Sequence, residues 1–125
     1  MSSGLFEQEG YDLMAAAFEV YNEMGNGFLE DVYQECFEME LGFRKTPFES
    51  QPELPLTYKG NSLKKRYRPD LIVVGEIIVE LKAIKRLGDN EYAQILNYLK
   101  ATGKRVGYLI NFGSAGELEW KRFVV

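Results

Sequence analysis

The chain has 125 residues, of which 46% are hydrophobic and 27% are charged, a composition typical of one globular domain spanning residues 1–125. It contains no His and a single Cys, so His-based catalysis, His metal ligands, an internal disulfide and a Cys-rich zinc site are excluded. The net charge of −4 divides into −10 over residues 1–57 and +6 over residues 58–125. A nucleic-acid partner would therefore contact the C-terminal part, unless the division reflects only the solvated sides of helices and strands.

Membrane insertion is not expected from the distribution of apolar residues. No apolar run approaches the roughly 20 residues that a membrane-spanning helix needs. The N-terminus also lacks a basic, apolar signal sequence. We therefore expect a soluble protein of the cytoplasm.

Two helices are predicted in the acidic N-terminal part. The first covers about residues 5–24, where apolar residues recur at helical spacing and place Phe18 on the buried side. The second covers about residues 29–41, with Leu29 on its apolar stripe. Residues 46–55 contain three Pro and are predicted to form an extended connection rather than a domain boundary, because the part on either side is too small for a good core.

The basic C-terminal part is predicted to contain the strands. Two hairpins are expected from β-prone runs separated by turn residues, namely residues 54–58 with 63–68 and residues 70–74 with 77–82. A helix over residues 90–101, with Leu96 on its apolar face, and strands over residues 106–112 and 118–125 follow. This order predicts an α/β fold in which a mixed β-sheet is flanked by α-helices.

Two charged residues interrupt the strongly apolar strand at residues 77–82. Because side chains alternate along a strand, Glu80 and Lys82 share one face with Ile78. The run is apolar enough on both faces to be a central strand, so both charges are expected in a partly buried space. An unpaired charge there costs on the order of several kcal/mol, so a partner or a metal ion is expected. The alternative is an exposed Glu–Lys pair on an edge strand.

Asp70 begins the preceding strand and is a candidate partner for Glu80. Antiparallel pairing of the two strands would bring both carboxylates together if the register allows it. Adjacent carboxylates repel and raise each other's pKa unless a divalent cation neutralises them, and oxygen ligands of this kind suit Mg²⁺ or Mn²⁺. Lys82, on the same face, could then hold a water molecule at the metal. The alternative for Asp70 is a turn residue before a strand.

Glu30 is the third candidate acid. It lies at the edge of the apolar side of the second predicted helix, where it can face a site under the sheet. Asp31, Glu35 and Glu38 are expected on the far, solvated side. Alternatively, Glu30 is a plain N-terminal acid that the helix dipole favours.

Gln94 and Tyr98 lie one turn apart on the last predicted helix, away from its apolar face. An amide and a phenol at this spacing can bind a phosphate and stack against or hydrogen-bond a nucleotide. A surface Gln beside a half-buried Tyr is the alternative.

Several motifs of the chain, taken together, resemble those of a family of small prokaryotic proteins. The segment from Gly27 to Tyr33 resembles the GxxExxY signature of that family. The other matching motifs are Tyr58-Lys59-Gly60, Arg68-Pro69-Asp70, Val79-Glu80-Leu81-Lys82, Ala93-Gln94-Ile95-Leu96-Asn97-Tyr98-Leu99 and Ile110-Asn111-Phe112-Gly113. The family looks like a compact member of the PD-(D/E)XK superfamily and is similar to the RecB-like nucleases. The resemblance covers about residues 25–123 and implies a restriction-endonuclease-like core.

The resemblance also implies roles for individual residues. Asp70 and Glu80 would bind Mg²⁺ or Mn²⁺, with the Leu81 carbonyl as a further ligand and Glu30 as a direct or water-mediated one. Lys82 would orient the attacking water and stabilise charge. Some RecB-like enzymes have an additional His ligand, which this chain lacks, so either Glu30 takes its share or the metal binds more weakly.

For the substrate, the resemblance implies that Gln94 and Tyr98 contact the nucleic-acid backbone or order the site, and Arg68 is a further candidate contact. The expected function is that of a metal-dependent nuclease, in which metal-activated water attacks a phosphodiester of DNA or, second, of RNA. A nucleic-acid-binding module of the same fold without useful turnover is one alternative. An oligomerising or partner-binding protein, such as a homodimer, is another.

Overall fold

The two runs with helical periodicity form α1 (Glu7–Met24) and α2 (Glu30–Phe43) in the computed structural model, which describes residues 4–125. Both predicted helices are thus confirmed, but two side chains expected in the core are not there. Phe18 is 39% exposed because it lies beside a cavity, and Leu29 is 75% exposed because its extended backbone precedes the first turn of α2. The buried positions of α2 are Tyr33, Phe37 and Leu41.

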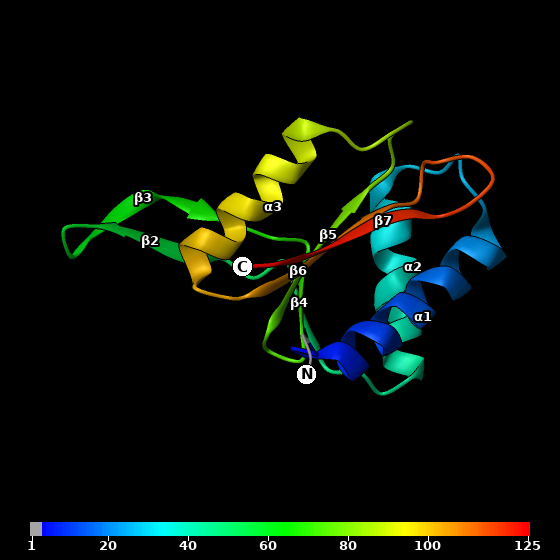
Figure 1. The fold of residues 1–125 in the computed structure, drawn as a ribbon, viewed down its shortest axis with the longest axis horizontal. Coiled ribbons are helices and arrows are strands. Elements are labelled where there is room, and N and C mark those ends of the chain that lie inside the picture. The colour runs from blue at the N-terminus through cyan, green and yellow to red at the C-terminus, as the bar shows by residue number, and fades with distance from the viewer. Residues whose placement is uncertain (1–3) are drawn as a thin grey trace.

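A five-stranded mixed sheet separates these helices from α3 (Asp89–Thr102), as Figure 1 shows. Among the strands of residues 4–125, β5 and β6 form the only parallel pair, and α3 makes the crossover between them, as a parallel connection requires. The predicted α/β fold with a flanked mixed sheet is therefore confirmed. In spatial order, the strands are β1 (Phe48–Ser50), β4 (Leu71–Val73), β5 (Ile77–Lys82), β6 (Val106–Asn111) and β7 (Glu119–Val124).

The edge strand β1 lies in the segment that was expected to be a plain connection. Phe48 pairs with Val73 and Ser50 pairs with Leu71, in the antiparallel sense. The sequence gives little signal for this strand, because it is three residues long and lies between Pro47 and Pro52. Its assignment as a connection was wrong, and the sheet gains its fifth strand there.

The first predicted hairpin forms a separate two-stranded sheet from β2 (Leu54–Tyr58) and β3 (Asn61–Tyr67). The two strands pair antiparallel, with a register shift between Pro55 and Thr57. In Figure 1 this hairpin projects from the main sheet near α3. Most of its side chains are exposed, although Leu54 packs against the part of the core that α3 covers.

Alternation along β5 and β6 divides the core into two parts. Val79 and Leu81 pack with the residues of α1 and α2, whereas Ile78 packs with Ile95 and Leu99 of α3. Glu80 therefore lies on the face that α3 covers. Leu96 was expected to be buried in this layer, but it is 41% exposed, because it lies about 100° around α3 from Ile95 and outside the cluster that Ile95 and Leu99 form.

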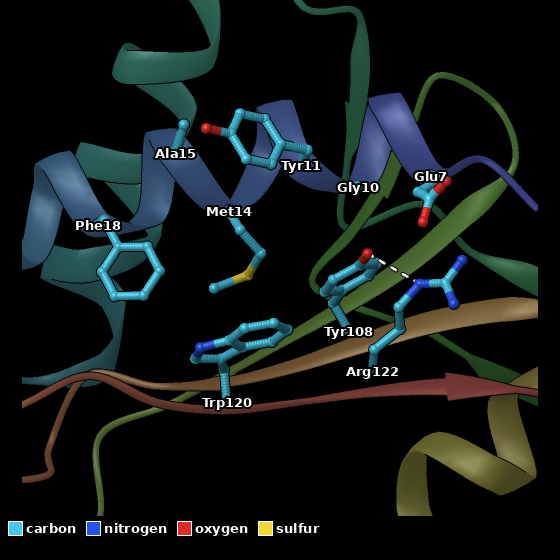
Figure 2. A pocket seen from close by; sticks show the side chains of 9 residues that line it. All are labelled: Glu7, Gly10, Tyr11, Met14, Ala15, Phe18, Tyr108, Trp120 and Arg122. Carbon is cyan, nitrogen blue, oxygen red and sulfur yellow. Dashed lines mark hydrogen bonds between the residues drawn. The ribbon is translucent and has the colours of Figure 1, made fainter. Parts of the chain in front are cut away.

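A cavity of about 440 Å³ lies between α1 and the β6–β7 edge of the sheet. The rings of Tyr108 and Trp120 stack there, with centroids 6.1 Å apart, and Arg122 donates a hydrogen bond to the Tyr108 hydroxyl (Figure 2). Gly10 allows α1 to lie close to the Tyr108 ring, because a Cβ at its position would lie 1.9 Å from the Tyr108 hydroxyl oxygen. The cavity lies on the α1 side of the sheet, across from Glu80.

The end of β6 fixes the segment that leaves β5. Buried Asn111 accepts hydrogen bonds from the backbone N–H groups of Ile84 and Gly113, and it donates one to Glu119. Phe112 N–H donates to the Lys82 carbonyl at 2.8 Å. The chain just after Lys82 is therefore held by the neighbouring strand.

Within residues 4–125, no helix has the length and apolar character needed to cross a membrane.

Replacing Gly113 with Ala should destabilise the fold. A Cβ at this position would lie 2.4 Å from both the backbone N and the backbone O of Ile84, so the two segments would have to separate. We expect Gly113→Ala to lower the free energy of unfolding by at least about 2 kcal/mol in urea denaturation. Gly42→Ala is the matched control, because its Cβ meets no atom within 4 Å and Ala favours a helix by up to about 1 kcal/mol. Equal stability of the two variants would contradict this account.

Candidate active site

The register between β4 and β5 sets Asp70 opposite Glu80. Leu71 pairs with Val79, and continuing this antiparallel register by one residue brings the two acids together. Glu80 Oε2 accepts a hydrogen bond from the Asp70 backbone N–H at 2.8 Å. Asp70 Oδ2 accepts one from the Leu81 backbone N–H at 2.7 Å. Each carboxylate is therefore anchored on the backbone of the other strand.

A tight turn between the strands fixes this register. Val74 and Gly75 have positive φ values of 49° and 73°, and Glu76 N–H donates to the Val73 carbonyl at 3.1 Å. Positive φ at both central residues matches the twist of a hairpin, although it is unfavourable for a β-branched residue such as Val74. A slip of one residue would turn Glu80 to the opposite face of the sheet, so the turn determines where the two acids meet.

The carboxylate pair is poorly solvated. Glu80 is only 3% exposed, and burial, followed by the negative charge of Asp70, raises its pKa to about 8. Burial also raises the pKa of Asp70 to about 6, and the charges of Glu30 and Glu38 act in the same direction. Without a cation, the pair therefore holds a proton near neutral pH. Because β5 is central and Glu80 is buried, the interpretation as an exposed edge-strand pair is wrong.

Lys82 lies on the same face as Glu80 and contacts α3. Its Nζ donates a hydrogen bond to Gln94 Oε1 at 2.7 Å. Its positive charge lowers the pKa of both acids, but among residues 4–125 no carboxylate oxygen lies within ion-pair distance of Nζ. The Lys82 ammonium is therefore held near the two acids by the Gln94 amide, and it forms no ion pair with either acid.

Tyr98 follows Gln94 by one helical turn and also reaches this region. Its hydroxyl donates to the Arg68 carbonyl at 3.4 Å, and burial together with the charge of Glu80 raises its pKa. The side chain of Arg68 points elsewhere, since its guanidinium forms an ion pair with Glu53 at 2.7 Å. The structure thus places Gln94 and Tyr98 near the two acids. The backbone carbonyl of Arg68 also lies there, but its guanidinium does not.

Glu30 is exposed at the first turn of α2, and its charge raises the pKa of both Asp70 and Glu80. It is near enough to act electrostatically, but it does not complete a cluster. In the part of the chain that the structure describes, no group of three or more His, Cys, Asp or Glu side chains could hold a metal ion. Its role as a third ligand remains a prediction.

Two residues of α2 that the sequence analysis did not assign to the site, Gln34 and Glu38, also lie at it. Gln34 Nε2 donates to the Asp70 carbonyl at 2.9 Å and to Glu38 Oε2 at 2.7 Å. Glu38, which was expected to be solvated on the far side, is partly buried and accepts a hydrogen bond from Ser50 at 2.6 Å. That expectation was wrong because β1, which was not predicted, covers this side of α2. The spacing of Glu30, Gln34 and Glu38, one turn apart, could have revealed the polar stripe.

The donor set of the pair fits a hard divalent cation. The carboxylates of buried Glu80 and partly buried Asp70 lie together without a cationic partner at ion-pair distance, among the residues described, and each raises the pKa of its neighbour when it is charged. Carboxylate and carbonyl oxygens are the ligands that Mg²⁺ and Mn²⁺ prefer. Such an ion would relieve both the repulsion and the missing solvation.

Comparison with known proteins identifies a family and finds solved structures with a similar fold. The family model of the PD-(D/E)XK nuclease superfamily matches residues 7–123. The crystal structure of SSO0001 matches 75% of this chain with a TM-score of 0.57 and 21% sequence identity, a likeness that concerns the fold alone. The match covers 48% of SSO0001, so this chain spans about half of its length. Among curated proteins, none matches this chain. The fold is thus restriction-endonuclease-like, as expected.

The raised pKa of Glu80 predicts that the protein becomes less stable as the pH rises. Between its ordinary pKa of 4.5 and about 8, the folded state keeps a proton that the unfolded state has released. The free energy of unfolding should therefore fall across this window by on the order of 1 kcal/mol or more in the absence of divalent cations. Urea denaturation in EDTA at a series of pH values measures this change. Glu80→Gln, which cannot ionise, should remove most of the fall, and an equally steep fall in that variant would refute the assignment.

Proposed function

This chain belongs to the PD-(D/E)XK nuclease superfamily, and on that premise we propose that it is a metal-dependent nuclease that hydrolyses phosphodiester bonds of nucleic acid. The observation that carries the proposal is the pair formed by buried Glu80 and partly buried Asp70, with the ammonium of Lys82 beside it. Within the superfamily, we place the chain with the GxxExxY proteins, because Gly27 to Tyr33 matches their signature.

We propose that Asp70 and Glu80 hold Mg²⁺ or Mn²⁺, with the Leu81 carbonyl and Glu30 as further ligands. When bound, the ion would act as a Lewis acid that stabilises negative charge on the phosphate. Because Asp70 and Glu80 are fixed by backbone hydrogen bonds, they would bind it without rearranging their strands.

Lys82 is proposed to act on the attacking water. Its Nζ–H groups can donate a hydrogen bond to the water oxygen and orient it toward phosphorus, and its charge stabilises the phosphate oxygens as negative charge develops. Gln94 limits the motion of the ammonium by accepting one of its hydrogen bonds. Gln94, Tyr98 and Arg68 are proposed to contact the substrate, with DNA as the first substrate to test and RNA as the second.

A second candidate function is a nucleic-acid-binding module that has lost useful turnover. The observation in its favour is that Glu30 is exposed and that, within residues 4–125, no third acid completes a metal-holding cluster. The site would then retain two carboxylates and a lysine, but would bind the cation too weakly for rapid cleavage. Salt-dependent binding without metal-dependent cleavage would select this function.

Removing one site residue should abolish cleavage. We expect Asp70→Asn, Glu80→Gln and Lys82→Ala each to reduce the rate of cleavage of labelled DNA in Mn²⁺ by at least about 100-fold, because each removes a group that acts on charge at the reacting phosphate. Lys100→Ala is the control, since Lys100 is exposed on α3 and should leave the rate unchanged. Cleavage at the wild-type rate in all four variants would assign the activity to a contaminant.

Metal binding should be visible without catalysis. Adding Mn²⁺ at about pH 7.5 should raise the thermal midpoint of the wild-type protein by a few degrees, because the ion binds the folded state and relieves the repulsion within the pair. EDTA should reverse the increase, and Glu80→Gln should lose most of it. An increase of the same size in Glu80→Gln would show that the ion binds elsewhere.

A further inference from the structure

A polar groove of about 380 Å³ lies between the β2–β3 hairpin and α3. It begins next to the catalytic candidates, because Gln94, which holds Lys82, is one of its lining residues. The hairpin forms the other wall, and Figure 1 shows that it extends away from the main sheet. The lining residues are Lys65, Arg66, Tyr67, Asn90, Ala93, Gln94, Asn97 and Tyr98.

The charge of the groove suits a polyanion. Lys65 and Arg66 line it and are exposed, and no Asp or Glu lies among the lining residues. Neither cation forms an ion pair with a carboxylate among residues 4–125, so both charges face solvent. The groove is thus a positive surface that meets the acidic pair only at its Gln94 end. A phosphate backbone bound along the groove therefore avoids the negative charges of Asp70 and Glu80 over most of its length.

The aromatic residues of the groove favour unpaired bases. The rings of Tyr67 and Tyr98 meet edge to face, with centroids 5.1 Å apart and planes at 77°. This contact uses the edge of one ring and one face of the other, so further ring faces stay available, and both side chains are partly exposed. A base that is already stacked and paired within a duplex cannot stack on a tyrosine as well.

The amides and the size of the groove agree with this preference. Asn90, Gln94 and Asn97 supply donors and acceptors along one side of α3, which can meet the polar edges of bases that no complementary strand occupies. A volume of about 380 Å³ is that of a small-ligand pocket, large enough for individual nucleotides.

We propose that this groove binds a single-stranded polynucleotide, with its bases on the Tyr67–Tyr98 pair and its phosphates on Lys65 and Arg66. The proposal rests on the proposed function in that the strand would run past Gln94 to the reacting phosphate. It adds a strand-selective surface, and it assigns the exposed hairpin to substrate binding.

Binding in EDTA tests the groove separately from cleavage. We would measure the anisotropy of a labelled DNA strand of about 12 nucleotides, the RNA strand of the same sequence and the blunt DNA duplex, with the full chain. The DNA strand should bind at least about tenfold more tightly than the duplex. Tight binding of the RNA strand relative to the duplex would support the groove equally. Equal or tighter binding of the duplex would overturn the proposal.

Substitutions in the hairpin test the two kinds of contact. Tyr67→Leu should weaken binding of the strand by about tenfold through loss of stacking, whereas Tyr67→Phe should retain it. Lys65→Gln should reduce the slope of log affinity against log salt by about 0.7, which corresponds to one phosphate contact on a single strand. Lys64→Gln is the matched control. Lys64 is the neighbour of Lys65, carries the same charge and is exposed, but it does not line the groove.

Two further outcomes would overturn the proposal. The first is an equal change of slope in Lys64→Gln and Lys65→Gln, which would indicate only diffuse attraction. The second is competition by inorganic polyphosphate as strong as that by the DNA strand, since polyphosphate carries no bases. Thermal unfolding of each variant establishes that it is folded, and the exposed position of Lys65 keeps its test independent of the aromatic pair.

The two proposals fail in distinguishable ways. Strand-selective binding without cleavage in Mn²⁺ would leave the groove assigned and remove the nuclease activity. Metal-dependent cleavage without strand preference, and without an effect of Tyr67→Leu, would leave the nuclease assigned and remove the groove.

Discussion

Two hydrogen bonds between carboxylates and the backbone of the opposite strand determine the arrangement of the whole site. Asp70 and Glu80 each accept an N–H from the strand that carries the other acid, so their negative charges are brought together rather than apart. Burial then raises the pKa of both groups. Such an arrangement is unfavourable for the folded chain alone, and proteins keep unfavourable arrangements mainly where they serve a function.

The rest of the fold supports this contact in layers. The apolar side of β5 that faces α1 and α2 anchors the strand in the core, so its other side can carry Glu80 and Lys82. On that second side, α3 returns the chain to β6 and places Gln94 against Lys82 in the same step. The crossover therefore both closes the sheet and positions the ammonium. Asn111, at the end of β6, then holds the chain that leaves β5.

Much of this could be predicted from the sequence, because the strongest signals are local. The periodicity of the helices and the β-prone runs predicted the element order except for β1, and two charges within the apolar run of β5 marked the candidate site. The short hairpin between Asp70 and Glu80 indicated that the acids would meet if the register allowed it, and the observed pairing of β4 with β5 has that register. The alternation of β5 alone showed which residues share a face.

What could not be predicted depends on distant contacts. β1 exists only because β4 offers it an open edge, and Glu38 is partly buried only because β1 lies against α2. Phe18 and Leu96 have the right spacing for burial, but Phe18 lies beside a cavity and Leu96 is not part of the cluster that α3 packs on the sheet. The position of Glu30 depends on how the first turn of α2 meets the sheet, which periodicity does not determine.

The hairpin of β2 and β3 pairs with no strand of the main sheet. A change in its length or charge therefore leaves the alignment of β4 on β5 intact. In the proposed function, the hairpin wall of the groove can therefore vary in sequence while the acid pair on β4 and β5 keeps its geometry. The same separation offers a route to engineering, in which a different arm is grafted onto an unchanged catalytic scaffold.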